Sequence, residues 1–284
     1  MEFGFSVDPA QGLSPEDELA SVRFGAQLGY RSAWTPSGGD AATFDRCTAW
    51  NGASGLSTGI SVVPASAQPA AFYAEHASRV WEATGGAFVL GVGSGRLAHP
   101  ATEMRPYLAE LRRLTPSALP LYVAALGPRM LGLAAELADG VLLNWCTAEQ
   151  VRWSRAEVER VAESTGRAAP VIAEYIRTAV DSDPDRARRA LATAAQGYAL
   201  GPSAYRRHFE RMGFSEDLQR WRSAGAELPP ERLSSVGAWG APGSVGGQVL
   251  RLAAGLDLAI IRVLVAVPGD ATSARLALAE CQPA

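Results

Sequence analysis

Eight continuous apolar stretches recur along this chain, and a segment with helical signals follows each of them. Stretches that do not alternate polar with apolar residues are typical of parallel strands covered on both faces. A chain that begins with such a strand and ends with a helix favours a closed (β/α)8 barrel, the TIM-barrel class of α/β fold. A doubly wound open sheet is the structural alternative. The expected strands span residues 2–6, 32–35, 57–63, 87–92, 121–125, 140–145, 171–180 and 258–267.

Capping signals mark several of the intervening helices. Ser14 and Pro15 combine an N-cap with a proline at the first helical position. Thr147 stands three residues before Gln150, the spacing of a capping box, and Asp183 precedes another helix-opening proline. Further helices are expected over residues 41–53, 69–84, about 102–114, 128–137, 242–255 and 270–281.

Residues 197–239 break the alternation between the seventh and eighth expected strands. This segment is long and contains Gly-Pro and Pro-Pro breaks. On a barrel it would add short helices over the mouth, so we expect a helical insertion here. Neither an internal repeat nor a linker-like shift in composition appears, which predicts one domain over residues 1–284.

Charge and composition exclude several function classes. The net charge of −3 offers no positive field for nucleic acid. No apolar run approaches the ~18 residues of a membrane span, and the first residues lack the pattern of a signal peptide, so we expect a cytoplasmic protein without a membrane partner. All 26 basic residues are arginine. Without lysine, pyridoxal Schiff bases, lysine-dependent aldolases and the GK[ST] phosphate loop are excluded.

Cysteine and histidine spacing indicates neither a disulfide framework nor a metal. Cys47, Cys146 and Cys281 are scattered and form no CxxC pair. The histidines show no HExxH or two-histidine-one-carboxylate spacing, and we expect no metal.

The carboxyl ends of barrel strands and the loops after them form the active site in this fold class. Glycines at 91, 93 and 95 would let a backbone approach a flat ligand, although their spacing is wrong for GxGxxG. Main-chain N–H groups at the start of the helix after residue 127 would bind a phosphate, and the Arg129 guanidinium could donate further hydrogen bonds to it. An ordinary strand-to-helix turn fits that spacing equally well. The four loops of interest cover residues 34–40, 58–64, 91–95 and 124–130.

Four segments together resemble one family across nearly the whole chain. They are GYRSAWTPSGGDAATF, TGISVVPASAQPAAFYAEHASRVWEATGGAFVLGVGSGR, PLYVAALGPRMLGLAAELADGVLLNW and AWGAPGSVGGQVLRLAAGLDLAIIRVLV. In this order they are similar to the bacterial luciferase-like flavin and deazaflavin oxidoreductases, nearest to the branch typified by methylenetetrahydromethanopterin reductase. The resemblance implies a (β/α)8 barrel with an insertion near strand seven, usually a homodimer, that binds its cofactor in the mouth.

The resemblance also implies where a cofactor would lie. The third strand of that family ends in a non-proline cis peptide that backs the cofactor ring, and Ser61–Val62 is the matching bond here, followed by Val63. Gly93 and Ser94 would lie along the ring or the ribityl chain. Main-chain groups of Ala125, Leu126 and Gly127 would donate to the phosphate.

Two departures from the family pattern concern the substrate side. Many relatives carry an acid–histidine pair where this chain has Ser37 and Gly38. Sugar-phosphate relatives have an acid where Arg96 stands. The substrate and proton donor therefore do not carry over from the family. The stretch between Arg96 and Pro120 is also shorter than usual.

These observations predict an oxidoreductase that moves a hydride between coenzyme F420 and a small-molecule substrate with a C=C or C=N bond. His99, Asp40 and Tyr175 are the candidate proton donors or orienting groups. Asp40 could equally cap the helix after it, and Tyr175 could pack under helices. An FMN-dependent monooxygenase is the alternative within the class, and a non-catalytic flavin-binding protein is the alternative outside it.

Overall fold

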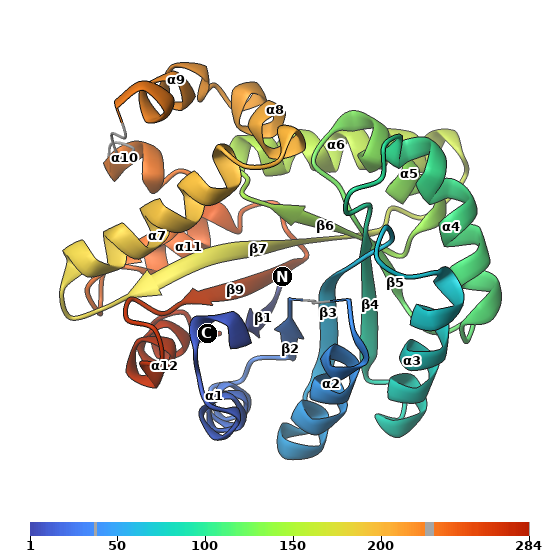
Figure 1. The fold of residues 1–284 in the computed structure, drawn as a ribbon, viewed down its shortest axis with the longest axis horizontal. Coiled ribbons are helices and arrows are strands. Elements are labelled where there is room, and N and C mark those ends of the chain that lie inside the picture. Colours follow the sequence, from blue (N-terminus) through green and yellow to red (C-terminus); the bar gives the residue numbers. More distant parts are fainter. Residues whose placement is uncertain (37–38, 225–229, 284) are drawn as a thin grey trace.

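Parallel strand pairing closes the sheet of this protein into a ring. The computed structural model describes residues 1–36, 39–224 and 230–283. β1 pairs with β2 on one side and with β9 on the other, while β6 pairs with both β5 and β7. The barrel is therefore confirmed, and the open-sheet alternative is wrong because an open sheet would leave two unpaired edges (Figure 1). The ring strands are β1 (Glu2–Ser6), β2 (Ser32–Thr35), β3 (Ser57–Pro64), β4 (Phe88–Gly93), β5 (Leu121–Ala124), β6 (Gly140–Asn144), β7 (Val171–Val180) and β9 (Leu258–Leu264).

One short strand lies outside this ring. β8 (Ala238–Gly240) pairs in parallel with the last three residues of β7, beyond the part of β7 that pairs with β6. The sequence pattern does not predict β8, because three residues at the end of the expected insertion are too short a run to show a strand pattern.

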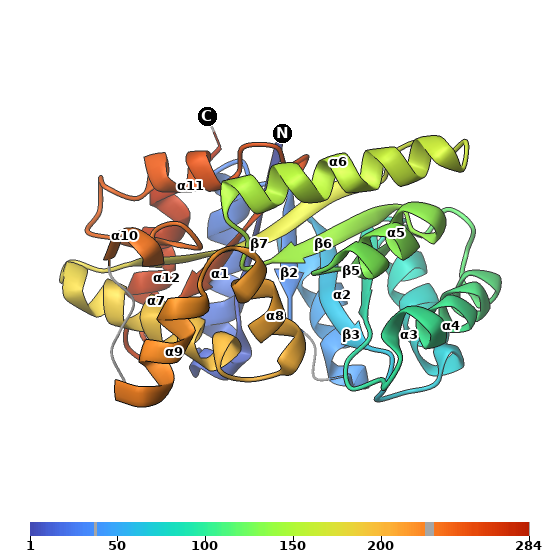
Figure 2. The ribbon, with the colours of Figure 1, turned by 90° about the horizontal axis from the view of Figure 1, so that it is seen from above.

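The helices lie around the outside of the ring (Figures 1 and 2). The side chains of Ser14, Thr147 and Asp183 accept the expected capping bonds from the main chain. The helix expected over residues 242–255 is shorter, and Gly243, with φ +88°, lies in the turn before it. The helices are α1 (Pro15–Gln27), α2 (Ala41–Ser54), α3 (Ala70–Ala83), α4 (Pro100–Leu114), α5 (Pro128–Leu137), α6 (Ala148–Ser164), α7 (Pro184–Ala199), α11 (Gly246–Leu252) and α12 (Ala271–Glu280), with a 3₁₀ turn η1 (Pro9–Gln11) after β1.

The expected insertion is helical and builds a small core of its own. It contains α8 (Ser203–Arg211), α9 (Ser215–Ala224) and α10 (Pro230–Leu233), which gather on one side of the barrel in Figure 2. Phe209 and Phe214 pack there against Trp145, the residue directly after β6. The insertion is therefore attached to the carboxyl end of a barrel strand.

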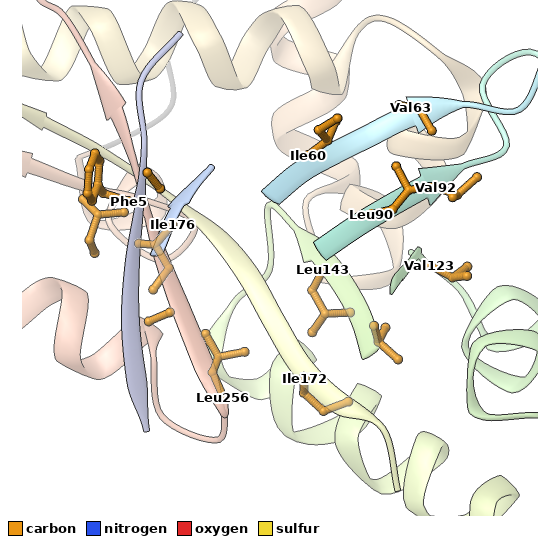
Figure 3. Packing of buried hydrophobic residues seen from close by; sticks show 14 of the residues in the cluster. Phe5, Ile60, Val63, Leu90, Val92, Val123, Leu143, Ile172, Ile176 and Leu256 are labelled. Atoms are coloured by element: carbon orange, nitrogen blue, oxygen red, sulfur yellow. The ribbon is translucent and has the colours of Figure 1, made fainter. Parts of the chain in front are cut away.

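Two further apolar layers support the barrel. The larger one lies between strands and helices, and Figure 3 shows part of it around Ile60, Leu90 and Leu143. The smaller one fills the bore and includes Trp34 and Tyr122, whose ring centroids are 6.1 Å apart. Strand glycines make room for these rings, since a Cβ on Gly59 would lie 2.5 Å from Trp34 and one on Gly140 would lie 2.5 Å from Tyr122. Within the described part of the chain, no helix has the length and apolar character needed to cross a bilayer.

Candidate functional site

The carboxyl end of β3 is bulged toward β4. The Ser61–Val62 peptide bond is cis, and the β3–β4 register shifts between Ile60 and Val63. The predicted position of the cis bond is confirmed. A Cβ on Gly93 would lie 2.7 Å from Val62 Cγ2, so packing of the bulge itself already requires a glycine there.

The turn after β4 is fixed by the loop that follows β3. Gly95 has φ +60°, and a Cβ on it would lie 2.4 Å from Ser66 Oγ. The same Ser66 oxygen accepts a hydrogen bond of 2.9 Å from the Arg96 N–H. Ser94 is half-buried between these positions, and its contact with a ligand stays a prediction.

The loop between β5 and α5 presents free main-chain donors. Ala125 is buried and donates its N–H to Leu142 O at 3.1 Å, which removes it from the expected phosphate donors. The N–H groups of Leu126, Gly127 and Arg129 donate to no atom of the described residues. Three free N–H groups at the positive end of a helix are suited to an anionic group.

Arg211 from the insertion reaches this loop. Its Nη1 donates to Leu126 O at 2.7 Å, and a Cβ on Gly127 would lie 3.2 Å from its Nη2. The exposed Arg129 side chain was the cation expected here, whereas Arg211 was missed because sequence alone cannot place an insertion helix. The free amides and the two guanidinium groups fit the phosphate of F420 or FMN, which the chain would hold without any lysine.

One face of α8 seats the insertion on the barrel mouth. Tyr205, His208 and Arg211 follow each other at three-residue spacing along the helix. The Asn144 amide donates to Tyr205 Oη at 2.6 Å, and His208 Nε2 lies 3.0 Å from Trp145 O. These contacts anchor α8 across the ends of β5 and β6.

The opposite side of the mouth is built from charged and aromatic side chains. Arg177 on β7 and Arg262 on β9 are partners in the parallel register. Tyr175 stands two residues before Arg177, on the same face of β7. Its ring centroid is 5.7 Å from Arg177 Cζ and 5.5 Å from Arg262 Cζ.

Tyr175 points into the bore. Its hydroxyl accepts a hydrogen bond of 3.4 Å from Ser6 Oγ, and the interaction with the Ser61 side chain at the β3 bulge lowers its pKa. Burial raises the pKa of Tyr175 and outweighs the two arginines, so the hydroxyl keeps its proton at neutral pH. The expectation that Tyr175 packs under helices is wrong, because its neighbours are the bore residues.

Asp40 and His99 lie at helix starts. Asp40 is exposed and accepts hydrogen bonds from Thr43 N at 3.2 Å and Thr43 Oγ1 at 2.8 Å. The hydrogen bond from the Thr43 hydroxyl lowers the pKa of Asp40. His99 is exposed before α4, where its N–H donates to Glu103 Oε1 at 2.6 Å. The positions of the missing acid–histidine pair, Ser37 and Gly38, lie outside the described residues.

A buried polar cluster supports the end of β6. Glu174 Oε1 accepts from Cys146 N at 2.7 Å, and Cys146 Sγ lies 3.7 Å from His208 Nε2. Burial raises the pKa of Glu174 to about 8 and lowers the pKa of His208 to about 4. Burial also raises the pKa of the Cys146 thiol, which keeps it protonated and unreactive. Over residues 1–36, 39–224 and 230–283, no group of three or more such side chains is placed to hold a metal ion.

The protein is a parallel (β/α)8 barrel with free amides on one side of its mouth and a tyrosine between arginines on the other, at the end of the barrel where this fold class carries its active sites. The model of the luciferase-like monooxygenase family matches residues 100–257, more than half of the chain. This protein therefore belongs to the luciferase-like monooxygenase family.

Relatives and solved structures give the nearer context. The chain is 29% identical to a 5,10-methylenetetrahydromethanopterin reductase of Archaeoglobus fulgidus over 172 aligned residues, which cover 48% of this chain and 51% of that protein. The match therefore spans about half the length of that relative.

The fold is similar to that of two F420-dependent enzymes. The coenzyme F420 dependent tetrahydromethanopterin reductase from Methanopyrus kandleri superposes with a TM-score of 0.78 at 17% identity, covering 98% of this chain and 97% of that one. An F420-dependent secondary alcohol dehydrogenase in complex with an F420-acetone adduct gives 0.72 at 15% identity, with 99% and 97% coverage. At such identities the likeness shows the fold alone.

Proposed function

We propose that this protein is an oxidoreductase that transfers a hydride between coenzyme F420 and a small organic substrate with a C=C or C=N bond. The observation that carries the proposal is the set of free N–H groups at Leu126, Gly127 and Arg129 beside Arg211, at the mouth of a luciferase-like barrel. The methylenetetrahydromethanopterin reductase relative, together with the F420-dependent enzymes of similar fold, supports F420 as the cofactor. When bound, F420 supplies or accepts the hydride; in the reducing direction one substrate carbon gains the hydride, its double-bond partner gains a proton, and the cofactor is oxidised.

The residues of the β3–β5 side bind and orient the cofactor in this proposal. The amides of Leu126 and Gly127 and the Arg211 guanidinium hold its phosphate. Val62, Gly93 and Ser94 form the surface against which the flat ring lies. Val63 does not, because its side chain is fully buried in the layer between strands and helices. α8 restricts water at this edge because Tyr205 and Arg211 fix it to the ends of β5 and β6.

Tyr175 holds the proton that the substrate gains in the reducing direction. Its hydroxyl remains protonated at neutral pH, lies in the bore and contacts Ser6 and Ser61. Among the three candidates, we favour Tyr175 as the donor because of these contacts near the β3 bulge. Roles for His99 and Asp40 in the reaction remain predictions.

Reconstitution tests the proposal. Purified protein is titrated separately with F420 and FMN by calorimetry, and oxidation of reduced F420 is then followed by absorbance with enone and imine acceptors. We expect F420 to bind and to be oxidised by at least one acceptor class. Binding of FMN without F420 would contradict the cofactor assignment, and tight F420 binding without oxidation by any acceptor would favour a non-catalytic carrier.

The family description favours one second candidate, an FMN-dependent monooxygenase. The free amides of the β5–α5 loop suit the FMN phosphate equally well. An oxygen electrode separates the two functions, because a monooxygenase consumes oxygen with reduced FMN and substrate, whereas the proposed reductase does not.

The proposal also includes a single domain, a homodimer and a cytoplasmic location, all carried by the family resemblance and composition. Sedimentation velocity on the purified protein tests the dimer. A monomer at the concentration used for the activity measurement would contradict it.

A further inference from the structure

A cationic cavity lies on the β7–β9 side of the mouth. Its volume is about 490 Å³, within the ~300–1,000 Å³ range of small-molecule sites. Ordered by their place in the chain, its charged and aromatic lining residues are Asp8, Arg177, Arg186, Arg189, Tyr198 and Arg262.

Most of these arginines are neutralised by acids of the protein. Arg262 forms an ion pair with Asp8 and donates to Ser6 Oγ at 3.2 Å. Arg186 pairs with Asp181 at 2.8 Å, and Arg189 lies 3.8 Å from Asp183. Their charges are therefore already balanced within the chain.

Arg177 is different, because it is buried without a carboxylate partner in the described chain. It is 3% exposed, and its hydrogen bonds to described residues come from Nη1 alone, which donates to Asn144 Oδ1 and to Tyr175 O. The rings of Trp145 and Tyr198 lie 4.6 Å and 5.1 Å from its Cζ. Aromatic faces attract a cation but do not neutralise it.

Among the described residues, no acid forms an ion pair with Arg177. The charge of Glu174 interacts with Arg177, but burial raises the pKa of Glu174 to about 8, so it is mostly protonated at neutral pH. Burial also lowers the pKa of Arg177, and Arg262 contributes in the same direction, yet a guanidinium remains charged at neutral pH. A buried charge without a partner is costly, which favours an anion supplied by a ligand.

The donors left on Arg177 indicate which anion. Nε and Nη2 have no acceptor among the described residues, and neither is sealed from solvent. Together they form one planar edge of the guanidinium, which matches the two oxygens of a carboxylate. One unbalanced positive charge also suits a monoanion better than a phosphate dianion.

We propose that Arg177 anchors a carboxylate group of the substrate in this cavity, so that the substrate class is a small unsaturated carboxylic acid. This inference rests on the proposed function for the reaction itself, in which the carboxylate is unchanged. β7 and β9 lie four strands around the ring from β3 and β4, so this anchor is opposite the proposed cofactor surface. Tyr175, two residues before Arg177, reaches across the bore to Ser61 at that surface.

The test measures binding without any cofactor. Cinnamate and the uncharged cinnamamide are titrated into the protein by calorimetry at fixed ionic strength, with inorganic phosphate as a further probe. We expect cinnamate to bind about 10- to 100-fold more tightly than cinnamamide, the range for hydrogen bonds to a charged group. Equal affinities of the acid and amide, or tighter binding of phosphate than of cinnamate, would overturn the proposal.

Variants assign the preference to Arg177. Arg177→Gln should remove the acid-over-amide preference, and Arg177→Lys, which keeps the charge but not the planar edge, should retain only part of it. Arg189→Gln is the matched control at the exposed rim of the same cavity and should lower cinnamate affinity less than about 3-fold. A preference that survives in folded Arg177→Gln contradicts the assignment. If that variant does not fold, the Arg177→Lys comparison decides, and an unchanged preference there overturns the planar-edge anchor.

The result is separable from that of the proposed function. If the native protein binds F420 but does not prefer cinnamate over cinnamamide, only the Arg177 anchor is overturned. If it prefers cinnamate but does not bind F420, the proposed function is overturned and Arg177 remains an anion site.

Discussion

The two sides of the barrel mouth are made from different parts of the polypeptide. On the β3–β5 side, the main chain supplies the features, namely a bulge at Val62 and free N–H groups at Leu126 and Gly127. On the β7–β9 side, the side chains of Tyr175, Arg177 and Arg262 supply them. Main-chain donors recognise a phosphate on any ligand that carries one, whereas a buried arginine selects one charge and shape. Cofactor binding and substrate selection should therefore be separable by mutation.

The β7–β9 side of the mouth, the side-chain half, carries an energetic cost. The β3–β5 side, the main-chain half, does not carry this cost. Register places Arg177 and Arg262 side by side on adjacent strands, and like charges in such pairs are destabilising. Asp8 neutralises Arg262, while Arg177 has no acid partner in the described chain. Trp145, which packs against Arg177, has φ +56°, a left-handed conformation that is rare for a bulky residue. Such features are concentrated at functional sites.

The largest expected effect comes from removing the proton donor on the side-chain half. Tyr175→Phe keeps the ring in the bore but loses the hydroxyl, and turnover with F420 should fall by about 10²- to 10⁴-fold, the usual contribution of acid–base catalysis. F420 affinity should change little, because the phosphate site is on the other half. Steady-state kinetics and calorimetry measure the two quantities.

Tyr122→Phe is the matched control for this substitution. Tyr122 is also in the bore, and its hydroxyl makes no hydrogen bond within the described residues. The control should keep its turnover and melting temperature. An equal loss of turnover in both variants would indicate a packing effect and contradict the assignment of Tyr175.

The buried titratable groups behind the side-chain half should make stability depend on pH. The pKa of Glu174 is raised from 4.5 to about 8 in the folded protein, so folding favours its protonated form. The contribution of protonated Glu174 to the free energy of unfolding is fully present below about pH 4.5 and is lost as the pH rises through 8. Glu174→Gln keeps an acceptor for Cys146 N and removes the ionisation.

Melting temperatures between pH 5 and pH 8 test this prediction. The melting temperature of Glu174→Gln should rise relative to that of the native protein as the pH increases. At pH 8 the relative gain should be about 5 °C or more. Glu163→Gln, at an exposed position of α6, should show a difference that does not depend on pH. A constant difference for Glu174→Gln across the range would contradict the raised pKa.

A smaller effect is expected at Arg211, the cation that α8 brings to the main-chain half. Arg211→Gln should weaken F420 and FMN alike by about 10-fold, since a single charge-assisted hydrogen bond is lost. Cinnamate binding should stay unchanged, because its proposed anchor is across the mouth. Arg207→Gln, on an exposed position of the same helix, is the control for charge. Weakened cinnamate binding in Arg211→Gln would show that the two halves are not independent.

The sequence predicts the main-chain half better than the side-chain half, for a physical reason. Apolar runs and capping residues are local signals, and they placed the eight ring strands and the β5–α5 loop. Arg177 and Arg262 become neighbours only through the β7–β9 register, which local patterns do not determine. Their signal is nonetheless visible, because Arg262 interrupts an otherwise apolar strand and Arg177 stands with Glu174 in a largely apolar one. Arg211 carried no comparable signal, since the position of an insertion helix depends on tertiary packing.

The smallest expected effect concerns Asp40, where a cap and a catalyst make opposite predictions. The structure gives Asp40 the contacts of an N-cap on α2, and Asp40→Ala should lower stability by about 1 kcal/mol through loss of the bond to Thr43 N. Asp40→Asn keeps that acceptor and should restore most of the stability. A cap leaves turnover with F420 unchanged in both variants. If Asp40→Asn is stable but loses turnover, the Asp40 carboxylate acts in the reaction. Groups that take part in proton transfer would then lie both on the β7–β9 side of the mouth and after β2.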